Sequence, residues 1–443
     1  MPHLLNITDG TTTLPLSTTS AMLQHYVPET PKLDDAGQFQ PVGETADLLL
    51  YGANVAAVEA TLNALETMRL TARRRRMTGA GPRVYLQYQP IGGTLGRSEV
   101  REVEVRLGRN AMTGYGQAKL PVQLLAERAP WWEEGRAQIP LTNGNGTNNT
   151  AGLTVWDRDD ATAGQDNWAD IGAGVVGGVL PSPLEIQMRN LTGASRSYHN
   201  FYVANNTFAP SMSHFLEAEN RTNGVGTVTA SSTSSNGNYL RMTGTNIYVT
   251  WTLPQALLAA VAGRYVRVMA RFANYTGASP IYARATLLDY YGLVTLARTP
   301  YEAKLQLEES HIHDLGLLPL PPGGYSTGWA QNTLALTLRS ESSATVDLDF
   351  LQITPADELC YRHIEQRGMA VAANDWIVDD GIEGLQYLIE GGANHPIYTE
   401  HTPPLHVFPG VAQRLYFLHD GPDTSASWRL SVKAFYRPRR LTL

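Results

Sequence analysis

The chain has 443 residues, of which 43% are hydrophobic and 17% are charged, and its formal net charge is −7. The length predicts two or three domains, and the acidic balance argues against nucleic acid as a specific partner. Its single cysteine, Cys360, excludes an internal disulfide framework and a multi-cysteine zinc site.

The N-terminal stretch MPHLLNITDGTTTLPL contains no basic region, no long apolar run and no cleavage site, so it does not read as a signal peptide. No window approaches the roughly 18 continuous apolar residues of a membrane span. We therefore expect a protein made in the cytoplasm that does not associate with a membrane.

Residues 1–135 predict a β domain with one helix. The first strands turn at Asp9-Gly10. A helix follows the cap residue Asn54, with apolar residues three and four apart: Val55, Val58, Leu62, Leu65 and Met68. The helix ends in the tract Arg73 to Arg76, which we interpret as cations near a helix C-terminus, with interface or anion contacts as the alternative.

Three strands follow in this domain. The segment SEVREVEVRLGR alternates charged and apolar residues, as protected edge strands do, and we expect it to lie at an edge where a neighbouring subunit could pair. Trp131 and Trp132 close the domain, and we expect them to pack at a domain or subunit edge.

The strands of residues 136–208 and of residues 356–443 are too few to form separate sandwiches. The second segment contains a Pro-Gly hairpin and what reads as one long final strand, SWRLSVKAFYRPRRL. The simplest arrangement is one β-sandwich split in sequence, with residues 209–355 inserted as a second β-sandwich or jelly roll. Whole domains are tolerated as insertions where chain ends lie close together.

Common catalytic motifs are missing from the sequence, so we predict no catalytic residues and no enzyme activity. His311 and His313, with Asp314, could offer two metal ligands without a third, and an exposed polar loop is the simpler reading. The aspartates that follow residue 156 suit calcium by type, but we expect a solvated turn: Asp157, Asp159, Asp160, Asp166 and Asp170. Asp379-Asp380-Gly381 reads as a turn.

The inserted region resembles the β-sandwich carbohydrate-binding modules found on glycoside hydrolases. Four segments carry the resemblance in order over about 140 residues: FLEAEN, AGRYVRVMARFAN, GGYSTGWAQNTLALTL and VDLDFLQI. The segment LEESHIHDLGLLPLPPGG is longer and more apolar than the corresponding family loop.

The resemblance implies two sites. In such modules, carboxylates of the first strand and an aspartate of the last strand hold a structural Ca²⁺, which here gives Glu217, Glu219 and Asp349. The alternative is that both glutamates alternate on an edge strand. The family's aromatic platform for sugars corresponds to Tyr325 and Trp329, flanked by Tyr290 and Tyr291, although these four residues could instead be structural.

The flanking regions look like a siphophage distal tail protein, the adaptor of the tail tip or baseplate. The cues are the opening LNITDGTTTLPL, one amphipathic helix followed by strands, and a second β domain with the hairpin HVFPGVAQRLYFL and the ending FYRPRRL. The resemblance implies a homo-oligomeric ring, commonly a hexamer, that contacts the tail tube and tail-tip hub proteins in the virion.

Two functions therefore compete. The first is a structural virion protein whose insertion binds a glycan of the host surface. The second is a polysaccharide-active enzyme, a glycoside hydrolase or lyase, with an appended binding module. An enzyme would need two carboxylates about 5–10 Å apart in a cleft.

Overall fold

The computed structural model describes most of the chain, in segments separated by gaps. The described residues are 3–18, 20–108, 118–148, 150–160, 164–207, 215–277, 279–289, 294–300, 302–305, 311–322, 332–356, 359–397, 403–420 and 428–443. They form mainly antiparallel β-sheets, which confirms the predicted fold class. None of their helices is both long and apolar enough to cross a membrane.

The chain divides into two compact units. The first comprises residues 1–137, 177–180 and 437–443, and the second comprises residues 138–176 and 181–436. The C-terminal residues thus return to the first unit. The expected long final strand is wrong in its second half, because the strand ends at Tyr436 and a separate short strand follows Pro438.

The first unit is a single nine-stranded sheet with the order β2-β1-β5-β6-β7-β4-β3, to which β8 and β34 add at β6. Its strands are β1 (Leu4–Thr8), β2 (Thr13–Pro15), β3 (Ala21–Tyr26), β4 (Val42–Tyr51), β5 (Val84–Gln89), β6 (Gly96–Leu107), β7 (Lys119–Arg128), β8 (Trp132–Glu133) and β34 (Arg439–Arg440). Every second residue of β4 is buried and the residues between them are exposed or half-buried, as in a strand with one face on a core.

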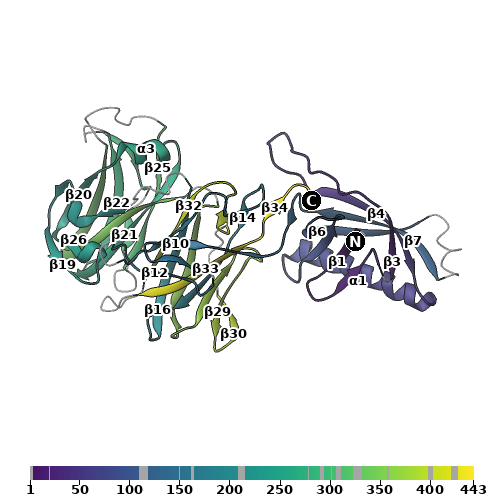
Figure 1. Ribbon diagram of the computed structural model, residues 1–443. Coiled ribbons are helices and arrows are strands. Elements are labelled where there is room, and N and C mark those ends of the chain that lie inside the picture. The colour runs from purple at the N-terminus through teal and green to yellow at the C-terminus, as the bar shows by residue number, and fades with distance from the viewer. Residues whose placement is uncertain are drawn as a thin grey trace. The chain divides into compact units, whose positions relative to one another are not determined.

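One helix, α1 (Val55–Thr78), lies along this sheet (Figure 1). The Asn54 side chain caps it by accepting a hydrogen bond of 3.0 Å from the Ala57 N–H, and Gly79 ends it with a φ of 67°. Its buried residues recur every three or four positions: Val58, Thr61, Leu65, Met68 and Ala72. Arg75 and Arg76 lie in the last turn, as predicted for cations at a helix C-terminus.

The positions of β6 and Trp132 bear on two expectations about this unit. The charged strand is β6, and its predicted position at an edge is wrong, because β6 lies between β5 and β7. A charged residue at every second position marks one solvated face of a strand, and it does not show that the strand is unpaired. Trp132 lies fully buried in the core of the unit, with the Arg128 guanidinium 4.3 Å from its ring centroid.

The second unit contains a two-sheet arrangement whose strands come from both sides of the insertion (Figure 1). One sheet has the order β11-β10-β13-β32-β16-β27, from β10 (Leu141–Asn143), β11 (Gly146–Asn148), β13 (Trp168–Ile171), β16 (Arg196–Asn206), β27 (Tyr361–Val371) and β32 (Gln413–Asp420). We call residues 138–176, 181–206 and 361–436 together the host sandwich.

The other sheet of the host sandwich has the order β12-β33-β15-β28-β29-β30, with β9 beside β33. Its strands are β9 (Ala137–Ile139), β12 (Leu153–Trp156), β15 (Glu185–Asn190), β28 (Trp376–Asp380), β29 (Leu385–Glu390), β30 (Ala393–Pro396) and β33 (Arg429–Tyr436). A separate pair joins β14 (Ser182–Pro183) to β31 (His406–Val407).

The insertion occupies the position of a hairpin turn. The strands on either side of it, β16 and β27, are antiparallel neighbours, and Ala204 is paired with Tyr361. The chain therefore leaves the host sandwich and returns to it at adjacent points, which is the geometry that a tolerated domain insertion needs.

We call residues 215–355 the insert. Its ten strands form one sheet around its own hydrophobic core. They are β17 (Phe215–Glu217), β18 (Asn223–Gly224), β19 (Thr227–Ala230), β20 (Asn238–Thr252), β21 (Tyr265–Thr276), β22 (Ile281–Leu288), β23 (Thr295–Arg298), β24 (Ala303–Leu305), β25 (Ile312–Pro319) and β26 (Thr333–Pro355). A helix, α3 (Gln255–Val261), and two 3₁₀ turns, η1 (Ala218–Asn220) and η2 (Ser235–Gly237), complete it.

Candidate functional site

The predicted sugar platform falls outside the described residues. This applies to Tyr290, Tyr291, Tyr325 and Trp329, so their stacking role stays a prediction. The predicted calcium ligands Glu217, Glu219 and Asp349 are described, and the site is built from them.

Strand pairing brings two of these three residues together. β17 pairs with β26, and Glu217 is in register with Phe350, next to Asp349. The strand β21 pairs on the other side of β26 with a register shift at this point, between Arg271 and Phe272. Asp349 has no partner in that register, as in a β-bulge, and its side chain is fully buried.

The Arg271 guanidinium joins the insert to the host sandwich. One terminal nitrogen forms an ion pair with Asp349 of the insert, and the other lies 2.9 Å from Asp157 Oδ2 of the host sandwich. The arginine side chain is 4% exposed and both aspartates are 0% exposed. A buried arginine between two carboxylates is stable only as a group, because loss of one partner leaves an uncompensated buried charge.

The loop at η2 is fixed by the same groups. The Ser235 N–H donates to Asp349 Oδ1 at 2.8 Å, and the Ser235 hydroxyl donates to Glu217 Oε1 at 2.8 Å and contacts the Asp159 carbonyl. Arg271 donates to the Thr233 carbonyl at 3.0 Å. We call Asp157, Asp159, Glu217, Asp349 and Arg271 the buried seam.

Apolar contacts accompany the buried seam. Met269, Ile312 and Phe350 of the insert form a cluster with Tyr202, Tyr361 and Leu418 of the host sandwich. The Tyr361 hydroxyl also donates to Asp314 at 3.2 Å, which gives this aspartate of the HIHD segment a structural contact. The insert is therefore held on the host sandwich by buried contacts, and not by its two chain connections alone.

The arrangement fits calcium only in part. Glu217 Oε2 and Glu219 Oε2 are buried oxygens without a hydrogen-bond partner, as free ligands would be, whereas Asp349 already faces Arg271 and Ser235. Within the described ranges, no three or more His, Cys, Asp or Glu side chains are grouped so that they could hold a metal ion. The calcium assignment stays a prediction.

The prediction of calcium at Glu217, Glu219 and Asp349 has a direct test. If calcium binds the folded insert alone, it should stabilise the insert by about 2.7 kcal/mol at a hundredfold excess over Kd. Calorimetric melts of the full chain with calcium and with a chelator measure this. Equal melting temperatures would contradict the prediction, and Arg271 would then be the cation that pairs with Asp349.

Burial changes the charge state of the seam. It raises the pKa of Glu217 to about 9, with the charge of Asp349 as the next cause. It raises the pKa of Asp159 to about 6, assisted by Asp166. Burial raises the pKa of Asp349 to about 7 although Arg271 opposes this rise, and it also raises the pKa of Glu219. Near neutral pH, Glu217 therefore carries a proton while Asp159 is ionised.

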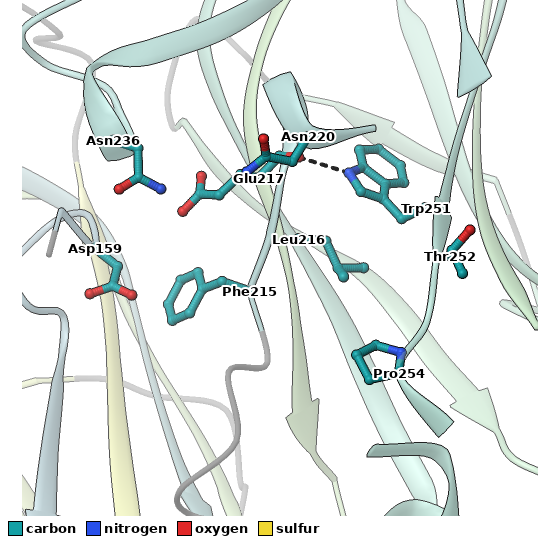
Figure 2. Close-up of a pocket in the computed structure, with 9 residues that line it drawn as sticks. All are labelled: Asp159, Phe215, Leu216, Glu217, Asn220, Asn236, Trp251, Thr252 and Pro254. Carbon is teal, nitrogen blue, oxygen red and sulfur yellow. Dashed lines mark hydrogen bonds between the residues drawn. The ribbon is translucent and has the colours of Figure 1, made fainter. Parts of the chain in front are cut away.

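A pocket of about 360 Å³ opens beside the seam. It is lined by residues of both the host sandwich and the insert: Asp159, Phe215, Leu216, Glu217, Asn220, Asn236, Trp251, Thr252 and Pro254. Figure 2 shows the carboxyl groups of Asp159 and Glu217 and the amide of Asn236 turned toward one gap, with the Phe215 ring beside it. The Trp251 indole N–H is held by the Glu217 carbonyl at 2.9 Å.

Stability of the second unit should fall as the pH rises from about 5 to about 9. A carboxyl whose pKa is higher in the folded than in the unfolded chain binds more protons when folded, so its contribution is complete below pH of about 4 and is lost through the folded pKa. Glu217→Gln should remove the part of the decrease above neutral pH, at least about 1.4 kcal/mol, the equivalent of one pKa unit. Calorimetry over a pH series measures this. An unchanged pH dependence in the variant would contradict the raised pKa of Glu217.

Other predicted positions have structural partners. His311 is buried, with Nδ1 2.8 Å from the Phe272 carbonyl, so the expectation of an exposed polar loop is wrong for it. The expected solvated turn is wrong for Asp157 and Asp166, which are buried. Asp380 forms the predicted turn by accepting from the Glu383 N–H, but Asp379 is buried and paired with Arg362.

Sequence reasoning missed Asp157, Asp159, Arg271 and Asn236 as site residues. The sequence did offer a signal for Arg271, which is the one charged residue in the apolar strand segment MARFAN. A cation buried in such a strand needs an acidic partner. Asp159 and Asn236 had no such signal, because they lie in loops that only the folded chain brings together.

Comparisons with known proteins find only weak similarities to this chain. No protein-family model matches the chain, and no curated protein matches it. Among solved structures it is similar to the SPP1 Dit (gp 19.1) protein, described as a paradigm of the hub adsorption apparatus in phages that infect Gram-positive bacteria, with 8% identity, a TM-score of 0.30 and 99% of each chain covered.

The chain is also similar to an exo-β-1,3-galactanase from Phanerochaete chrysosporium. In one structure, with galactotriose, the identity is 11% and the TM-score 0.22 over 70% of this chain and 78% of the other. In another, with galactose, the values are 12% and 0.19 over 73% and 84%. At these identities and TM-scores the structures assign neither a family nor a function.

Proposed function

We propose that the chain is a structural protein of a phage tail tip, a distal-tail or baseplate adaptor, whose insert binds a glycan of the host surface. It would assemble into a homo-oligomeric ring, commonly a hexamer, with tail tube and hub proteins as partners, and it would reside in the virion. It would act without catalysis, without a membrane and without specific nucleic acid.

The observation that carries the proposal is the way in which the insert is mounted. It replaces the turn between β16 and β27 and is held by the buried ion pairs of Arg271 with Asp157 and Asp349. A fixed orientation suits a particle that presents a binding module toward a surface. A module that only supplies substrate to an enzyme can work on a flexible linker.

The first unit supports assembly through the edges of its sheet. β3 is an edge strand, its segment AMLQHY contains no lysine, arginine or acidic residue, and its Met22 is 54% exposed. Edge strands without charges or prolines pair readily with a second chain.

We expect the purified chain to form a ring whose mass is a multiple of the chain mass, measured by light scattering. Met22→Lys places a charge on the β3 edge and should shift the equilibrium toward monomer. Met77→Lys, at a position of α1 that is 74% exposed, is the matched control and should leave the mass unchanged. A wild-type chain that stays monomeric at high concentration would contradict the ring.

The polysaccharide-active enzyme remains the second candidate because of one observation. Asp159 and Glu217 line the same pocket, and burial raises the pKa of Asp159 to about 6 and that of Glu217 to about 9. Two carboxyl groups with separated pKa values are typical of the base and acid of glycoside hydrolysis. Release of reducing sugar from envelope polysaccharide, lost in Glu217→Gln, would favour the enzyme, and no release would favour the structural role.

A further inference from the structure

The pocket at the buried seam has the composition of a site for a neutral, polyhydroxylated ligand. Of its nine lining residues, two are carboxyl groups, two are asparagine amides and none carries a positive charge. Such a set disfavours phosphate or uronic acid groups, which the Asp159 carboxylate would repel. Its volume of about 360 Å³ lies within the range of small-molecule pockets.

The polar groups of the pocket are held in place before any ligand arrives. Asp159 accepts a hydrogen bond of 3.2 Å from the Trp168 indole N–H. Asn236 follows Ser235, whose N–H and hydroxyl are bound by Asp349 and Glu217. Asn236 has a φ of 45°, a left-handed conformation that asparagine tolerates better than most residues. Positions fixed in this way lower the entropy cost of binding.

One polar atom in the pocket is left without a partner. Glu217 Oε1 accepts from Ser235, but its Oε2 is buried and has no hydrogen-bond partner. A buried oxygen without a partner carries a free-energy cost that a ligand hydroxyl could remove. Glu217 Oε2 and the Asp159 carboxylate beside it can accept from a ligand hydroxyl, and the Asn236 amide can both donate and accept.

We propose that this pocket binds a neutral saccharide unit, with the hydroxyls held by Asp159, Glu217 and Asn236 and an apolar face of the sugar against Phe215. Sugar hydroxyls can both donate and accept, which matches the two carboxyl acceptors and the Asn236 amide at the gap. Because Asp159 belongs to the host sandwich and the other three residues to the insert, the site is complete only when the insert is seated. The inference rests on the proposed glycan-binding role, and it locates a site separate from the aromatic positions Tyr325 and Trp329.

The test is calorimetric titration of the full chain with glucose, galactose, rhamnose and N-acetylglucosamine, and with glucosamine as a cationic probe. At least one neutral sugar should bind. Asp159→Asn and Asn236→Gly should each raise its Kd by about tenfold or more, since the first replaces a charged acceptor by a neutral amide and the second removes an amide. Asn236→Gly keeps the left-handed backbone accessible. Asp160→Asn, next to the pocket residue but not lining it, is the matched control and should bind as the wild type does.

The outcomes separate the pocket from the general glycan-binding role. Loss of binding in the two pocket variants, with unchanged melting temperatures and with binding retained in Trp329→Ala, supports the pocket. Binding that survives both pocket variants but is lost in Trp329→Ala overturns the pocket and leaves the glycan-binding role intact. Binding of glucosamine alone overturns the neutral ligand. Failure of every tested sugar to bind the wild-type chain also overturns the pocket proposal.

Discussion

Replacing Arg271 by methionine should lower the free energy of unfolding of the second unit by about 3–5 kcal/mol. The methionine retains most of the aliphatic volume but leaves Asp349 fully buried without its cation, and it leaves Asp157 with Arg158 alone, at 3.2 Å. Scanning calorimetry of the full chain should show the transition of the second unit at a lower temperature, with that of the first unit unchanged.

Arg339→Met is the matched control for this variant. Arg339 also lies in the insert and pairs with Glu302 at 3.3 Å, but its side chain is 60% exposed. Exposed ion pairs contribute about 0–1 kcal/mol, so the change should be small. Adding Asp349→Asn to Arg271→Met should recover part of the loss, because Asp349 is then neutral and Asp157 still pairs with the buried Arg158 at 3.2 Å. Equal effects of the two arginine variants would contradict a structural role for the buried seam.

Deleting residues 209–355 and joining β16 to β27 through a short Gly/Ser turn should leave a host sandwich that still unfolds cooperatively. The pairing of Ala204 with Tyr361 means that a turn can connect the two strands. The deletion uncovers Tyr202, Tyr361 and Leu418, so stability should fall by about 3–6 kcal/mol, the cost of exposing a few large side chains. Binding of saccharide should be lost completely.

A second variant of the shortened chain tests whether the uncovered apolar side chains lower its solubility. Tyr361→Thr and Leu418→Thr in the shortened chain replace uncovered apolar groups by polar ones and should improve solubility without restoring binding. Thermal unfolding followed by circular dichroism measures both forms. A broad transition in the shortened chain would show that the host sandwich needs the insert in order to fold, which contradicts the nested arrangement.

Local patterns predicted much of this fold. Helix α1 follows from the Asn54 cap and the spacing of Val58, Leu65 and Met68. The prediction of a split sandwich rested on counting strands that lacked partners. The order of strands within each sheet could not be predicted from the sequence, as the central position of β6 shows. Alternation indicates which face of a strand is exposed to solvent, but not which strands lie beside it.

The candidate site was less accessible to sequence reasoning. Glu217 and Asp349 were singled out by a resemblance and do lie close together, but the cation beside Asp349 is Arg271. Asp157 and Asp159 were read as a solvated turn because their loop is polar, but Asp157 is buried and pairs with Arg271 of the insert. Contacts between loops more than 70 residues apart leave no periodic trace in either segment.

The interrupted order of the host sandwich has a consequence for synthesis on the ribosome. Trp168 pairs with Tyr416, and Leu153 pairs with Val432. Strands that are synthesised before the insert therefore pair with strands that are synthesised after it. All strands of the insert emerge in between and can complete their own core first. During that interval β12, β13 and β16 lack the partners β32 and β33 that lie beyond the insert. Translation speed across residues 215–355 thus sets how long unpaired strand edges stay open to aggregation, and slow codons there should lower the yield of folded protein.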